Sequence, residues 1–199
     1  MIKLIQTLIS GLSLGSIYAL IALGYTMVYG IAKMLNFAHG DIIMIGAYAG
    51  IVTVTQLGLP PVIAIVLSVA VCALLGMTIE HFAYKPLRQA PALSVLITAI
   101  GVSYLLQNLA TYVTGGLPQM YPALPGLSNQ LTIAGVSTKY VTVVTPVLVV
   151  LLVAALTQLI NHTRIGMAMR AVSRDFETAQ LMGIRINSVI SVTFIIGSL

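Results

Sequence analysis

LIQTLISGLSLGSIYALIALGYTMVYGIA, residues 4–32, contains no lysine, arginine, aspartate or glutamate. These 29 residues exceed the roughly 20 apolar residues that an α-helix needs to cross a hydrocarbon core about 30 Å thick. Three further charge-free runs follow: 38 residues after Asp41, 50 after Arg88 and 24 after Lys139. Each run is long enough for one or two spans. The sequence therefore predicts an all-α membrane protein, built as a polytopic bundle of transmembrane helices.

The composition excludes other classes of protein. Of the 199 residues, 59% are hydrophobic and 7% are charged, whereas a soluble domain carries about 25% charged residues. The apolar runs lack the period-two alternation that is typical of β-barrel strands. The net charge is +5, but the basic residues stand singly at span ends, so we expect no nucleic-acid partner. The single cysteine, Cys72, cannot form a disulfide within the chain.

The positions of the runs predict five complete spans and one incomplete span, at residues 4–29, 42–59, 62–84, 93–114, 140–160 and 186–199. A connection rich in Gly, Pro and Ser, residues 115–139, is expected at the membrane interface or over a pore mouth. The last segment has 14 residues and is too short to cross a bilayer. We therefore expect one transmembrane domain, residues 1–199, that is incomplete at its carboxyl end.

The orientation of the spans follows from the lysines and arginines in the short loops, which favour the cytoplasmic side. One topology puts seven of these residues inside: Lys33, Lys85, Arg88, Arg164, Arg170, Arg174 and Arg185. The same topology puts only Lys3 and Lys139 outside. The reverse topology inverts this bias. We therefore expect the amino terminus to face outward.

The stretch RAVSRDFETAQLMGIR, residues 170–185, holds five of the 13 formally charged residues. Within it we expect a short helix from Ser173 to Gly183, with Ser173 as the amino-terminal cap. Asp175 and Glu177 lie in the first turn, where carboxylates favour the helix dipole. Gly183 suits the left-handed position after the last turn.

One face of this predicted helix carries an aromatic side chain beside small residues: Phe176, Ala179, Gln180 and Gly183. Two interpretations remain open on spacing alone. The helix is either a solvated loop helix whose arginines anchor the orientation, or a docking helix for a soluble cytoplasmic partner.

A second informative stretch is LNFAHGD, residues 35–41, in which Asn36, His39 and Asp41 cluster. We expect an ordinary cytoplasmic loop in which Asp41 caps the next helix. The alternative is a broken helix inside the membrane, whose free N–H groups face an anionic carboxylate. In either case polar residues at membrane depth are costly and often mark a transport pathway.

Other polar groups stand at span ends. Gln107 and Asn108, at the end of the fourth span, either hydrogen-bond between helices or line a pathway. Glu80 and Lys85 are interpreted as interfacial charges that extend to the headgroups. A proton relay would require Asp41, His39, Glu80 and His81 to meet in space.

Several segments carry a resemblance to a known family. Glu177-Thr178-Ala179-x-x-x-Gly183 is similar to the E-A-A-x-x-x-G loop of ABC importer permeases, with Thr178 as a departure from the pattern. Residues 15–48, 79–88, 94–108 and 164–184 resemble, in the same order, the LivH-type permease subunits of branched-chain amino acid importers. These matches together extend over nearly the whole chain.

The resemblance implies a multi-pass permease subunit of an ATP-driven importer in the bacterial inner membrane, for branched-chain or related aliphatic amino acids. It implies partners: cytoplasmic ATP-binding subunits, a second permease subunit and a periplasmic substrate-binding protein. The chain has no GxxxxGK[ST] phosphate loop, so ATP is expected on separate subunits, and we expect neither enzymatic activity nor a bound cofactor. The residues implied in ATPase coupling lie in the loop 170–185 and are Arg174, Asp175, Phe176, Glu177, Ala179 and Gly183.

Two rival functions remain at this point. Similar permeases serve urea or short amides, and an ion-coupled secondary transporter using Asp41 and Glu80 is a rival from another class. The presence of genes for ATPase and binding-protein subunits beside the gene for this chain would favour the importer.

Overall fold

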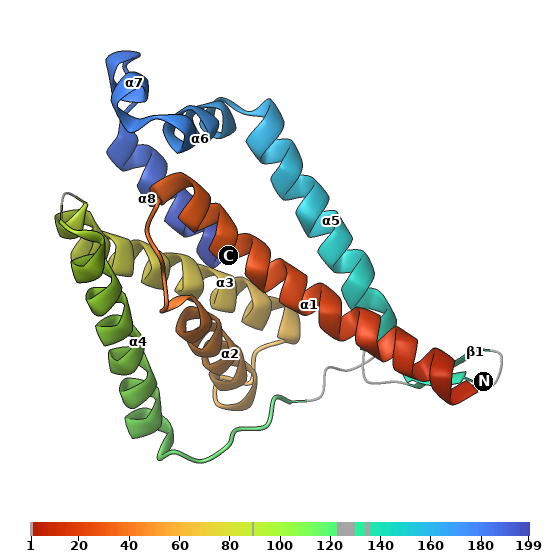
Figure 1. Ribbon diagram of the computed structural model, residues 1–199. Helices are drawn as coiled ribbons and strands as arrows, with labels where there is room; N and C mark the ends of the chain where they lie inside the picture. Colours follow the sequence, from red (N-terminus) through yellow and green to blue (C-terminus); the bar gives the residue numbers. More distant parts are fainter. Residues whose placement is uncertain (1, 89, 123–129, 134–135) are drawn as a thin grey trace. The chain divides into compact units, whose positions relative to one another are not determined.

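The computed structural model describes residues 2–88, 90–122, 130–133 and 136–199. Most of them are helical (Figure 1). The helices are α1 (Ile2–Ala32), α2 (His39–Thr55), α3 (Pro61–Ile79), α4 (Ala92–Thr114), α5 (Tyr140–His162), α6 (Arg164–Arg174), α7 (Phe176–Leu181) and α8 (Ile186–Ser198). α3 runs on into the π-helical turn η1 (Glu80–Tyr84) and the 3-10 turn η2 (Lys85–Leu87).

Four of these helical segments are long and apolar enough to cross a membrane: Lys3–Ala32, Pro61–Leu87, Ala92–Thr114 and Tyr140–His162. They confirm the predicted polytopic α-helical membrane fold. The predicted second span, residues 42–59, is a shorter helix, because α2 has 17 residues and ends at Thr55. At about 1.5 Å per residue, α2 is only about 25 Å long.

The chain divides into two compact units. The first comprises Met1–Leu23 and Ala123–Gly166, and therefore most of α1 and all of α5. In it, β1 (Gln130–Ile133) and β2 (Val136–Lys139) pair antiparallel, and β2 leads directly into α5. The sequence had indicated no strands here. The predicted position of the connection 115–139 concerns residues that lie partly outside the described part of the chain.

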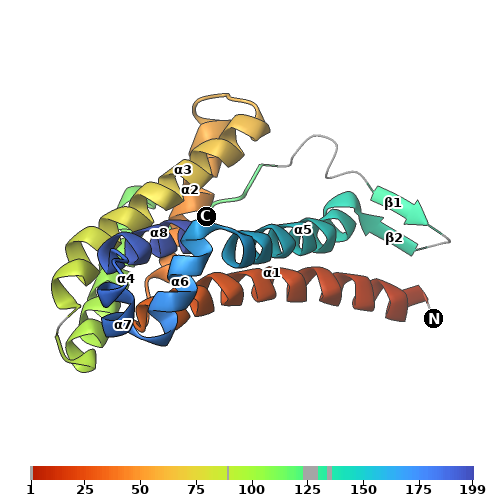
Figure 2. The ribbon, with the colours of Figure 1, turned by 90° about the horizontal axis from the view of Figure 1, so that it is seen from above.

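The second unit comprises Gly24–Pro122 and Met167–Leu199 and holds the larger core. α2 lies along α3, and α8 packs against α3 on another side (Figures 1 and 2). Glycines allow this close approach. A Cβ atom on Gly46 of α2 would lie 2.4 Å from Cys72 Sγ of α3, and one on Gly50 would lie 3.0 Å from Ser68 Oγ. Gly46 and Gly50 therefore act as a helix-packing pair.

Gly46→Ala should accordingly lower the free energy of unfolding by about 1–3 kcal/mol, because the added methyl group overpacks the contact with Cys72. Gly101→Ala in α4 is the matched control, since a Cβ atom there meets nothing within 4 Å. It should be neutral or stabilising by about 0.5–1 kcal/mol, because alanine favours the helix. Equal unfolding midpoints for the two variants in detergent would contradict the packing role.

The end of α1 and the segment that connects it with α2 both belong to the second unit. α1 ends at Ala32, Lys33 has a left-handed backbone (φ 56°), and a short extended segment leads to α2 (Figure 1). A Cβ atom on Gly24 would lie 3.2 Å from His39 Cε1. Gly24 stands eight residues before the end of α1, which is about 12 Å along the helix. The first residue of α2 therefore lies beside the interior of α1, about 12 Å before the carboxyl end of that helix.

Candidate functional site

The carboxylate of Asp41, in the first turn of α2, is held by two side chains of α4. The Ser103 hydroxyl donates to Asp41 Oδ2, and the Gln107 amide donates to Asp41 Oδ1 at 3.1 Å. Gln107 also donates to Ser103 Oγ at 3.0 Å. Asp41 is only 8% exposed. We call these three residues the Asp41 cluster.

The Asp41 cluster lies halfway along a membrane span. Ser103 is the twelfth of the 23 residues of α4, a helix about 34 Å long. The contact of His39 with Gly24, inside α1, places the start of α2 at depth independently. The predicted capping role of Asp41 is wrong. The cap position is Ala38, which makes no side-chain cap bond. The choice between a cytoplasmic loop and a broken helix stays a prediction, and the contact of Asp41 with Ser103 in the middle of α4 favours the broken helix.

The other predicted pathway residues take separate positions. Asn36 is buried and accepts a hydrogen bond from the Tyr84 hydroxyl at 3.1 Å. The His39 ring, also buried, lies 6.2 Å from the Tyr25 ring between centroids. Asn108 is exposed and donates to the carbonyl of Tyr104 in its own helix. Among the five predicted residues, Asp41 and Gln107 bond to each other.

Sequence reasoning missed Ser103, which completes the Asp41 cluster. A signal was available, because Ser103 precedes Gln107 by four residues and therefore lies on the same face of α4. Tyr84 was also missed. An aromatic side chain at the end of an apolar span gives no indication that its hydroxyl reaches Asn36.

A second polar cluster surrounds Glu80 in η1. Glu80 is only 1% exposed and forms an ion pair with Arg88. The Ser191 hydroxyl of α8 donates to Glu80 Oε2 at 2.9 Å, and Arg88 also donates to Asn187 of α8. We call these four residues the Glu80 cluster. The interpretation of Glu80 as an interfacial charge beside Lys85 is therefore wrong.

The two buried carboxylates belong to separate networks. Within the described part of the chain, no side chain hydrogen-bonds to both Asp41 and Glu80. His81 is exposed, and its ring lies edge-on to Phe82 with centroids 5.1 Å apart. The four groups of the hypothetical proton relay are therefore not joined in one hydrogen-bonded chain.

The charged stretch 170–185 forms two helices. α6 ends at Arg174, and Asp175 is the amino-terminal cap of α7, where it accepts from the backbone N–H of Glu177 at 2.9 Å. Ser173 belongs to α6, so its predicted capping role is wrong. Gly183 follows α7 with φ 81°, which confirms the predicted left-handed turn.

Asp175→Ala should speed amide hydrogen exchange at Glu177 and Thr178 several-fold, because α7 loses its cap, whereas Asp175→Asn should keep it. The Thr178 hydroxyl and backbone hold the pKa of Asp175 below its usual 3.8. Because the pKa of Asp175 is lower in the folded state, its carboxylate stabilises the folded state at pH values above the ordinary pKa. This stabilisation is lost as the pH falls through the lowered pKa. Exchange rates, corrected for intrinsic chemistry, should therefore not change between about pH 5 and 8. A cap-dependent transition in that range would contradict this role.

The predicted coupling residues divide between two sides of α7. Ala179 is buried, and Phe176 packs against the core of the second unit. Arg174 and Glu177 are exposed. The largest apolar side chains that α7 and the following turn leave uncovered are Leu181 and Met182, 87% and 79% exposed. The face carrying Phe176 and Ala179 is thus partly used within the chain.

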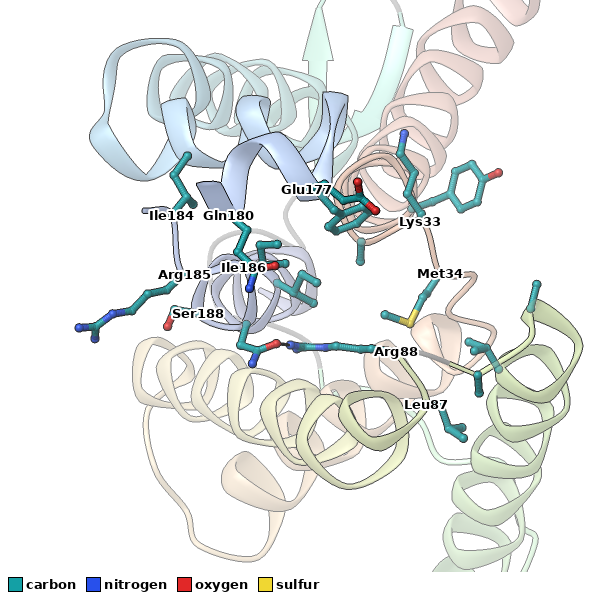
Figure 3. A pocket seen from close by; sticks show the side chains of 18 of the residues that line it. Lys33, Met34, Leu87, Arg88, Glu177, Gln180, Ile184, Arg185, Ile186 and Ser188 are labelled. Carbon is teal, nitrogen blue, oxygen red and sulfur yellow. Dashed lines mark hydrogen bonds between the residues drawn. The ribbon is translucent and has the colours of Figure 1, made fainter. Parts of the chain in front are cut away.

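A cavity of about 1170 Å³ lies beside α7 in the second unit (Figure 3). Glu177 and Gln180 of α7 line it on one side, with the start of α8. Lys33 and Met34, after α1, and Arg88, before α4, line it as well (Figure 3). The cavity therefore lies between α7, the segment after α1 that leads to Asp41, and Arg88 and Asn187 of the Glu80 cluster.

Comparison with known proteins identifies the group to which this architecture belongs. Residues 7–199 match the model of one protein family, described as "Branched-chain amino acid transport system / permease component". The chain belongs to this permease family. No solved structure matches it significantly.

Individual members of the permease family are similar over almost the full chain. BraD of Pseudomonas aeruginosa, a high-affinity branched-chain amino acid transport system permease protein, is 40% identical over 205 residues, covering 98% of this chain and 67% of BraD. LivH of Escherichia coli K12, described in the same words, is 37% identical over 208 residues with the same coverage. A probable LivH of Methanocaldococcus jannaschii is 27% identical over 177 residues, 85% of this chain and 55% of that protein.

Proposed function

We propose that the chain is a permease subunit of an ATP-driven importer that carries branched-chain or related aliphatic amino acids across the bacterial inner membrane. The observation that carries this proposal is the continuous similarity to such permeases over 98% of the chain. The polar Asp41 cluster halfway along a span supports it, since buried ionisable groups at membrane depth mark transport pathways.

The chain itself performs no chemistry in this function. Cytoplasmic ATP-binding subunits supply the energy, a second permease subunit completes the pathway, and a periplasmic binding protein delivers the substrate. Leu181 and Met182 are the apolar side chains through which α7 contacts the ATP-binding subunits, because they project outward beside the buried Ala179. Exposed apolar side chains that lie next to each other are typical of protein–protein contact sites.

Movement of α7 reaches the rest of the second unit by a short route. Only residues 182–185 separate α7 from α8, and the backbone N–H of Ile184 donates to the carbonyl of Ala179. α8 in turn holds Glu80 through Ser191 and Arg88 through Asn187. A displaced α7 therefore pulls α8 against the end of α3.

ATP-dependent uptake in vesicles tests the function directly. The complete transporter, with ATP-binding subunits and binding protein, should accumulate leucine, isoleucine or valine only when ATP is present. Uptake that continues without the ATP-binding subunits, and stops when the proton gradient is dissipated, would overturn the proposal in favour of a secondary transporter. Urea and acetamide belong in the same assay, because their uptake without amino acid uptake would assign the chain to the short-amide permeases.

A further inference from the structure

The charge on Asp41 is the feature that the proposed function leaves unexplained. The carboxylate lies beside Ser103, halfway along α4 and about 16 Å from either end of that helix. In the described part of the chain, Arg88 forms an ion pair with Glu80. No lysine or arginine there forms an ion pair with Asp41. A buried carboxylate is costly unless a positive group or hydrogen-bond donors lie beside it.

The contacts of Asp41 leave room for such a partner. A carboxylate offers about four lone-pair positions to donors. Ser103 occupies one on Oδ2 and Gln107 occupies one on Oδ1. Because Ser103 and Gln107 also bond to each other, α4 fixes the direction of the carboxylate. About two acceptor positions on Asp41 therefore remain for a ligand.

The remaining acceptor positions and the negative charge of Asp41 indicate which chemical group would bind there. A primary ammonium group carries three N–H donors and one positive charge, so it satisfies both the acceptors and the charge of Asp41. A zwitterionic amino acid brings this group with it, whereas urea and short amides bring no charge. The exposed position of Gln107 leaves this side of the cluster open to an entering molecule.

We propose that Asp41 receives the α-ammonium group of the transported amino acid halfway across the membrane, while Ser103 and Gln107 hold the carboxylate in place. This inference rests on the proposed function and names the group of the substrate that the Asp41 cluster recognises. The site consists of the first turn of the shorter helix α2 and the middle of the long helix α4.

Asp41→Asn tests the proposal, because asparagine keeps the size and accepts hydrogen bonds but carries no charge. In vesicles with the complete transporter, ATP-driven leucine uptake should fall at least about 30-fold, the effect of removing one partner of a buried charge pair. Stimulation of ATP hydrolysis by leucine-loaded binding protein should persist. Asp41→Glu should restore part of the uptake.

Thr53→Val is the control, since Thr53 is also buried on α2 but bonds only to its own helix. It should keep uptake within about two-fold of the unmodified protein. If Asp41→Asn also stays within about two-fold, Asp41 has a merely structural role and the proposal is overturned. If the unmodified transporter takes up no amino acid, the proposed function is overturned, and this inference is overturned with it.

Carbodiimide labelling gives an answer even if Asp41→Asn fails to assemble. Leucine, supplied with binding protein and ATP to the unmodified transporter, should slow labelling of the peptide that contains Asp41. The peptide that contains Glu80 serves as the internal reference, because Glu80 already has Arg88 as its partner. Equal labelling of the Asp41 peptide with and without leucine would overturn the proposal.

Discussion

Arg88→Met is expected to lower the free energy of unfolding by about 3–5 kcal/mol, the cost of leaving one member of a buried ion pair without its partner. Glu80 is almost completely buried, and the loss of Arg88 leaves its carboxylate with the Ser191 hydroxyl alone. The contact of Arg88 with Asn187 is lost as well, which separates the start of α4 from α8. Thermal and denaturant unfolding in detergent, followed by circular dichroism, measures the change.

Lys85→Met is the matched control for this experiment. Lys85 stands three residues before Arg88, is exposed, and was the cation that the sequence placed beside Glu80. Its replacement should change the free energy of unfolding by less than about 0.5 kcal/mol. The double variant Glu80→Gln/Arg88→Met should recover much of the loss, because it removes both charges. A single Arg88→Met variant as stable as Lys85→Met would refute the buried pair.

Gly183→Val is expected to reduce ATP-driven leucine uptake roughly 5- to 30-fold, because about 1–2 kcal/mol of backbone strain disfavours the native turn to that extent. Gly183 has φ 81°, a conformation that side chains with a Cβ atom rarely adopt. The variant should redirect the chain between α7 and α8, so ATP hydrolysis should continue while transport falls. Uptake and ATPase rates measured on the same vesicles give the ratio.

Gly58→Val separates loss of coupling from general strain. Gly58 has φ 62°, and a Cβ atom at either Gly58 or Gly183 meets nothing within 4 Å. Gly58 lies between α2 and α3, away from α7 in the sequence. Both variants should lose similar stability, but only Gly183→Val should change the number of leucine molecules carried per ATP. A similar ratio for the two would mean that the turn after α7 has no special role in coupling.

The spans were predictable because lipid excludes charge from long stretches of chain. The expected spans 93–114 and 140–160 differ from α4 and α5 by no more than two residues at any end. Gly183 was predictable for a local reason, since a helix that stops there needs a left-handed residue. The hairpin of β1 and β2 was not, because mixed apolar and polar residues rich in Gly and Pro indicate only an irregular connection.

The polar clusters were only partly predictable, because side-chain partners depend on depth and on turns. LNFAHGD is as polar as an aqueous loop, and nothing local reveals that its last residue, Asp41, lies beside the middle of α4. Glu80 and Arg88 are eight residues apart, which is about 12 Å along a regular α-helix. η1 and η2 interrupt that helix, so Arg88 can reach back to Glu80.

The position of Asp41 also has a consequence for the distance that a substrate travels. A group beside the midpoint of a helix of about 34 Å has equal lengths of that helix on either side, each about 11 residues. In the proposed importer, a substrate held at Asp41 would therefore pass the same length of α4, about 11 residues, to reach either side of the membrane.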